Sequence, residues 1–102
     1  MAARKEPAEL LREARAIIQS LRAECALDEY RTLRPARTQA LAALEADIEQ
    51  LLAQGAGGWG ARSAARNMHS LARRHAAAVR RLQSDPQYAQ MVRLQRDGRR
   101  QT

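Results

Sequence analysis

The chain has 102 residues, with 18 Lys and Arg side chains against 11 Asp and Glu, and its net charge is +7. Arg supplies 17 of the 18 basic side chains, Ala occurs 22 times, and Phe is absent. This length predicts one domain over residues 1–102 and excludes most enzymes, which need more chain to enclose a pocket and still bury a core. Abundant Ala, Leu, Arg, Gln and Glu, with few branched aliphatic residues, predict an all-α fold.

The first helix is predicted over residues 7–28. Pro7 suits the first turn of a helix, and Glu9 complements the positive end of the helix dipole. Apolar residues then recur at helical spacing and form one stripe: Leu10, Leu11, Ala14, Ile17, Ile18, Leu21 and Cys25. Because Cys25 is the only cysteine, it offers no disulfide framework and is expected to be a buried structural thiol.

The second helix is predicted over residues 32–54, with Thr32 as its cap and Pro35 in its first turn. Its apolar stripe contains Leu33, Ala40, Leu41, Leu44, Ile48, Leu51 and Leu52. Four glycines within residues 55–60 then predict a loop. This loop also carries Trp59, which either folds onto the end of the bundle or anchors a partner, since Trp is enriched at binding hot spots.

The third helix is predicted over residues 61–83 and is strongly amphipathic. Its apolar face is expected to contain Ala64, Met68, Leu71, His75, Ala78 and Leu82, widened by Ala65, Ala72 and Val79. The opposite face carries Arg62, Arg66, Arg73 and Arg80, flanked by Arg74 and Arg81.

A short helical segment is predicted over residues 86–96. Asp85 can cap it, Pro86 suits its first position, and Asp97-Gly98 is expected to end it. Short connections favour antiparallel neighbours, so we expect an antiparallel three-helix bundle of long helices with a short C-terminal helical segment. The N-terminus lacks the apolar run of a signal peptide, and no segment is apolar enough to span a bilayer, so the expected location is the cytoplasm.

The basic excess lies entirely in the second half of the chain. Residues 1–54 have a net charge of −1, whereas residues 55–102 have a net charge of +8. The six Arg side chains of the third helix can form a solvated face, contact nucleic-acid phosphates or lie on an anionic membrane. His69 and His75 fall on different faces of that helix, and no catalytic or metal-binding motif occurs, so we expect no cofactor and no metal.

Four segments of the chain resemble the FlgN-type flagellar export chaperones. They are the opening from Ala8-Glu9-Leu10-Leu11 through Leu27, Leu33 followed by the segment from Leu41 to Glu45, the Asn-containing segment from Ala65 to Leu71, and the ending from Leu94 to Arg99. This resemblance covers roughly residues 8–99. It implies a non-enzymatic bacterial chaperone that holds C-terminal segments of hook-associated proteins before export from the cytoplasm.

The predicted function is therefore binding of an amphipathic client helix against an exposed apolar stripe. The candidate partner-binding residues are Trp59, Met68, Leu71, His75 and Leu82. The alternative is a basic nucleic-acid-binding accessory protein that uses the six Arg residues of the third helix. The client, the oligomeric state and the division of the apolar stripes between core and binding surface stay open at this point.

Overall fold

The computed structural model describes residues 5–25 and 35–100, apart from the side chains of residues 25, 95, 96, 99 and 100. These described residues form four helices: α1 (Pro7–Cys25), α3 (Pro35–Ala53), α4 (Ala61–Gln83) and α5 (Pro86–Arg100). The all-α prediction is confirmed. The predicted end of the first helix at Asp28, the cap at Thr32, the stripe residue Leu33 and the Cys25 thiol lie outside what the structure describes.

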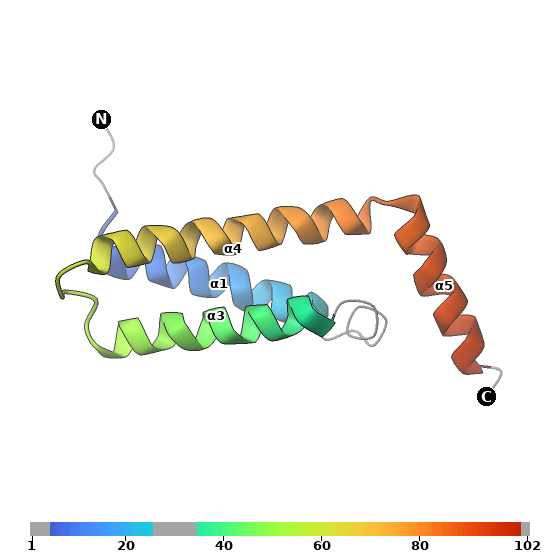
Figure 1. Ribbon diagram of the computed structural model, residues 1–102, viewed down its shortest axis with the longest axis horizontal. Coiled ribbons are helices and arrows are strands. Elements are labelled where there is room, and N and C mark those ends of the chain that lie inside the picture. The colour runs from blue at the N-terminus through green and yellow to red at the C-terminus, as the bar shows by residue number, and fades with distance from the viewer. Residues whose placement is uncertain (1–4, 26–34, 101–102) are drawn as a thin grey trace.

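The three long helices pack into a bundle, and α5 turns away from it at the end of α4 (Figure 1). The helices α1 and α4 run in the same direction, with α3 antiparallel to both. Because α5 projects from the bundle, the molecule is elongated, with extents of 55 × 29 × 15 Å and a radius of gyration of 16.6 Å. A compact domain of this length has a radius of gyration of about 13 Å.

The core is built from side chains of modest size, and α1 is at its centre because it packs against both α3 and α4. The buried residues are Leu11, Ala14, Ile18, Leu21, Leu41, Leu44, Ile48, Ala56, Ala65, Ala72 and Val79. The predicted stripes of the first two long helices are largely confirmed, although Ala40 is exposed. The packing between α1 and α4 is the most extensive in the bundle, and buried alanines on both helices let their backbones approach closely.

The sequence left open which apolar residues of α4 belong to the core, and the structure places the residues that widen the predicted face there. Ala65, Ala72 and Val79 are fully buried, whereas Leu71 is 43% exposed. The larger residues that define the predicted face therefore lie on its flank, because the helix turns its small residues inward. This rotation exposes an apolar edge of α4 beside α3.

The loop between α3 and α4 begins with a Schellman motif, which ends α3. The backbone N–H of Ala56 donates to the carbonyl of Leu51, and that of Gly55 donates to the carbonyl of Leu52. Gly55 adopts a φ of 87°, which glycine reaches without steric cost. The predicted loop is confirmed, and its buried Ala56 joins the core.

The last helix begins as predicted but does not end where Asp97-Gly98 was expected to stop it. The Asp85 carboxylate accepts a hydrogen bond of 2.9 Å from the backbone N–H of Gln87, and Pro86 takes the first helical position. The helix then continues through Gly98 to Arg100. A glycine inside a helix costs only about 1 kcal/mol, and Gly98 lacks the positive φ that would end it.

Two ion pairs join α1 to α3 at the edge of the bundle. Arg15 Nη1 lies 3.3 Å from Glu49 Oε1, and Arg22 pairs with Glu45. Exposed pairs of this kind contribute about 0–1 kcal/mol each to the stability of a protein. They therefore align α1 with α3 more than they stabilise the fold. None of the described helices has the length and apolar character needed to cross a membrane.

Candidate partner-binding surface

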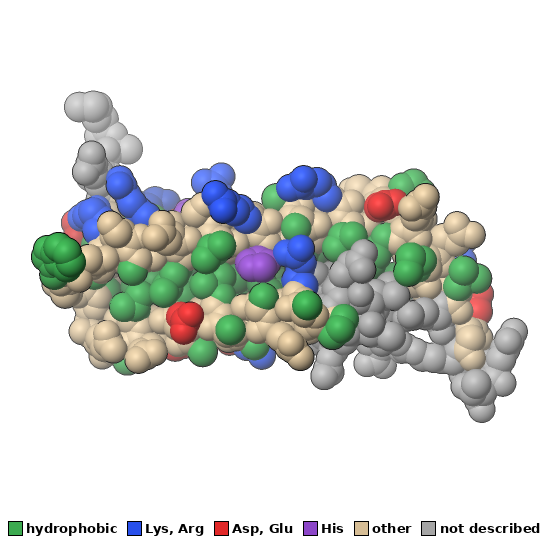
Figure 2. Space-filling model, viewed as in Figure 1, with side chains coloured by type: hydrophobic (Ala, Val, Ile, Leu, Met, Phe, Trp, Pro, Cys, Tyr) green, Lys and Arg blue, Asp and Glu red, His purple; other side chains and the backbone are tan. Residues whose placement is uncertain are grey.

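Half-exposed apolar side chains of α4 line its boundary with α3. We call this boundary the α3/α4 seam and define it by the α4 residues Ala64, Met68, Leu71, His75, Ala78 and Leu82. These positions share one helix face, which a hydrogen bond from Arg37 of α3 to His75 places beside α3. Figure 2 shows hydrophobic side chains gathered along this boundary, around a histidine.

The structure divides the five predicted partner-binding residues into two groups. Trp59 is fully exposed, at 105%, and Leu71 is also exposed. Met68 and Leu82 are half-buried and pack against the core, while His75 is half-buried beside α3. Folding of Trp59 onto the bundle end, which was one of its two predicted states, is therefore wrong. Trp59 and Leu71 offer exposed apolar surface, and the other three are half-buried in the bundle.

His75 is held at the seam by α3. Arg37 Nη1 lies 2.8 Å from His75 Nδ1, so the guanidinium donates and the neutral imidazole accepts. Burial of the imidazole, together with the nearby Arg37 charge, lowers the pKa of His75 below its usual 6.5. The imidazole at the seam is therefore neutral at pH 7 and presents a polar atom within an apolar surface.

Acidification from pH 7 to pH 5 is expected to destabilise the protein through His75. Because its pKa is lower in the folded state, the unfolded chain binds the proton first as the pH falls below about 6.5, and the free energy of unfolding decreases. His75→Gln keeps an acceptor for Arg37 but does not titrate. Thermal unfolding followed by circular dichroism should show a shallower loss of Tm in this variant, and equal losses in both proteins would contradict the assignment.

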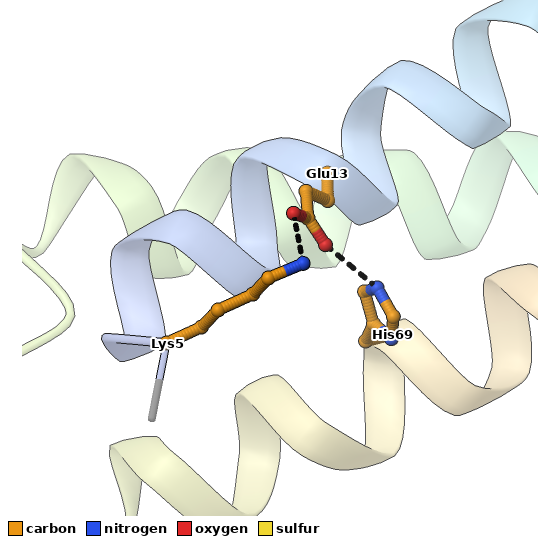
Figure 3. A network of polar contacts seen from close by, with 3 residues as sticks. All are labelled: Lys5, Glu13 and His69. Atoms are coloured by element: carbon orange, nitrogen blue, oxygen red, sulfur yellow. Dashed lines mark hydrogen bonds and ion pairs between the residues drawn. The ribbon is translucent and has the colours of Figure 1, made fainter. Parts of the chain in front are cut away.

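The other flank of α4 is tied to α1 through a second histidine. His69 Nε2 lies 3.1 Å from Glu13 Oε2, and the other carboxylate oxygen of Glu13 accepts from Lys5 (Figure 3). Hydrogen bonds from Lys5 and His69 and the charge of Lys5 lower the pKa of Glu13. The two histidines of α4 thus face different helices, and neither is close to a set of metal ligands: within the described ranges, no group of three or more His, Cys, Asp or Glu side chains could hold an ion.

The sequence predicted one stripe of Arg residues on α4, but these residues differ in whether they form an ion pair. Arg62 lies 3.7 Å from Glu6 and donates to the carbonyl of Lys5 at 3.2 Å. The remaining five are exposed and form no ion pair with any described residue: Arg66, Arg73, Arg74, Arg80 and Arg81. Since α4 itself contains no Asp or Glu, these five charges are available to a partner.

Several contacts at this surface were not foreseen from the sequence. Arg37 was not singled out, and the pairing of Glu13 with His69 links residues 56 positions apart. The α1–α3 pairs were not singled out either, and they join Arg15 to Glu49 and Arg22 to Glu45 in the crossed order of antiparallel helices. No family model matches this chain, and no curated protein or solved structure is significantly similar to it.

Proposed function

We propose that this protein is a non-enzymatic adaptor that binds an amphipathic helical segment of a protein partner at the α3/α4 seam. The observation that carries the proposal is the half-exposed apolar edge of α4, with Leu71 at its centre and Trp59 at one end. From Ala64 to Leu82 the seam measures about 27 Å, enough for a partner helix of about 18 residues. Apolar anchors at helical spacing are the usual basis of such recognition.

The charge around the seam supports an acidic partner. Arg74 and Arg81 each follow a seam residue, Leu71 and Ala78, by three positions, so they border its open side. The partner helix therefore carries Asp or Glu beside its apolar stripe, where these cations meet it. The net charge of +8 on residues 55–102 also increases the association rate of an acidic partner.

The FlgN-type resemblance supports one particular client class and location. On this basis, the proposed partner helices are the C-terminal segments of flagellar hook-associated proteins, which the protein would hold in the cytoplasm before export. A client segment that folds as it binds loses part of the gross interaction energy to its own ordering, which keeps net affinity moderate. Moderate affinity suits a chaperone that must release its client.

Leu71→Asp is expected to weaken client binding at least about 10-fold, because it places a charge at the centre of the apolar surface. The matched control is Leu94→Asp on α5, which makes the same change at another exposed leucine. Each variant is used to capture partners from nuclease-treated lysate of the source organism. The captured protein is identified by mass spectrometry, and its binding segment is then titrated as a peptide.

Retention of helicity decides how a loss of binding by Leu71→Asp is interpreted. The proposal requires the variant to keep its circular dichroism spectrum and to lose the partner, while Leu94→Asp keeps both. If Leu71→Asp unfolds the bundle, the seam is part of the core and the assigned site is wrong. If both variants bind the partner equally well, the partner sits elsewhere.

Nucleic-acid binding is the second candidate, and it is favoured by the five exposed Arg residues of α4 that form no ion pair within the described part of the chain. Salt separates the two functions, because five phosphate contacts would give a slope of about −4.5 in log affinity against log salt on duplex DNA. Binding through apolar surface should weaken only modestly as salt increases. A steep slope with DNA, and no protein partner sensitive to Leu71→Asp, would establish this second function.

A further inference from the structure

The flank of α4 that faces α1 forms a groove separate from the α3/α4 seam. Two adjoining hollows of about 560 and 410 Å³ lie along it and share Arg73 and Ala77 in their walls. We call the combined feature the α1/α4 groove. It extends from Arg66 to Gln83 along α4, a distance of about 25 Å at the rise of an α-helix.

The walls of this groove differ in charge, and its base is apolar. Ile17 and Leu21 of α1 and Ala76 of α4 line the base. The α4 wall carries Arg66, Arg73 and Arg80, which are exposed and form no ion pair with any described residue. The α1 wall carries Ser20 and Glu24, and Glu24 accepts a hydrogen bond of 3.3 Å from Gln83.

Three of the four Arg residues that line the groove are spaced at helical intervals, and Arg74 is the fourth. Arg66, Arg73 and Arg80 are each seven positions apart, so their side chains project from one face at intervals of about 10.5 Å. A partner α-helix lying along the groove repeats at the same interval. Carboxylates one heptad apart on that helix would therefore each meet an Arg, while the residues between them contact Ile17 and Ala77.

We propose that the α1/α4 groove is a second docking site, which binds an amphipathic protein helix with Asp or Glu at positions i and i+7 and small or apolar residues at i+3 and i+4. The acidic edge of this helix lies against α4. Its other edge is neutral or basic, because it lies against Glu24. This arrangement fixes the rotation of the bound helix about its axis.

A helix explains the groove better than a nucleic acid does. Phosphates would meet Glu24 on the α1 wall, and the apolar base offers them no favourable contact. No Trp, Tyr or Phe lines either hollow within the described part of the chain, so bases would have no stacking platform of the kind that single strands use.

The test uses the full chain and a synthetic helical peptide with Glu at three positions, each one heptad from the next, Leu at i+3 and i+4 of each heptad, and Ala elsewhere. Fluorescence anisotropy of the labelled peptide gives its Kd. Arg80→Glu is expected to weaken binding about 10-fold or more, and its neighbour Arg81→Glu less than about twofold, although both change the net charge equally. A peptide with Lys in place of only the Glu that meets position 80 should regain affinity for Arg80→Glu.

The outcomes that overturn the proposal are distinct. Equal losses in Arg80→Glu and Arg81→Glu would show general charge attraction rather than a groove, as would tighter binding of an oligo(dT) strand than of the peptide. Absence of measurable peptide binding would also overturn it. Leu71→Asp should leave the peptide affinity unchanged, and a loss there would place the peptide in the α3/α4 seam. The seam proposal depends on a different variant, so either site can fail without the other.

Discussion

Leu41→Ala is expected to lower the free energy of unfolding by about 2–5 kcal/mol, because it removes buried methyl groups and leaves a cavity. Leu41 is fully buried in α3, inside the cluster that α1, α3 and α4 share. Domains of this size have a total stability of about 5–15 kcal/mol, so this one change removes a large fraction of it. Each kcal/mol corresponds to a decrease in Tm of roughly 4–8 °C.

Leu94→Ala is the matched control for this prediction, since Leu94 is 62% exposed on α5. We expect its effect to stay within about 0.5 kcal/mol. Urea unfolding followed by circular dichroism measures both variants, and a lower midpoint with an unchanged m-value identifies a true loss of stability. Similar midpoints for the two variants would mean that Leu41 does not lie in the cooperative core.

Ala72→Leu is expected to have the second largest effect on stability, at about 1–3 kcal/mol, because it inserts methyl groups into a filled interface. Ala72 has no exposed surface, and it lies at the centre of the buried face of α4. Leu and Ala have similar helix propensities, so the change tests packing rather than helix formation.

Ala77→Leu, five residues further along the same helix, is the control for overpacking. Ala77 is exposed in the open α1/α4 groove, so the added side chain meets no filled interface. Its free energy of unfolding should therefore remain within about 0.5 kcal/mol of the wild type. If Ala72→Leu is as stable as Ala77→Leu, then the close approach between α1 and α4 is absent in solution.

The sequence predicted the helices well because their signals are local. Apolar spacing, Pro at first positions and the glycine-rich loop each act within a few residues, and α4 has the bounds expected for it. The predicted end of the last helix at Gly98 was wrong because one glycine weakens a helix without ending it.

The orientation of α4 could not be predicted, because it depends on the helices that pack against it. The sequence left open whether Met68, Leu71 and Leu82 belong to the core or to a binding surface, and in the structure close packing buries the alanines at positions 65 and 72. The contacts of the two histidines could not be predicted for the same reason, because their partners Glu13 and Arg37 are on other helices and distant in sequence. Exposure of Trp59 likewise requires the fold, since the loop sequence allows it to point either way.

Photo-crosslinking from position 71 is the most direct test of the proposed adaptor function. A photoreactive amino acid replaces Leu71 in one protein and Ala46, on the exposed outer face of α3, in another. The proposal predicts that the first protein crosslinks one partner in lysate through a peptide with apolar residues at helical spacing and acidic residues beside them. Crosslinks no stronger from position 71 than from position 46 would contradict binding at the α3/α4 seam.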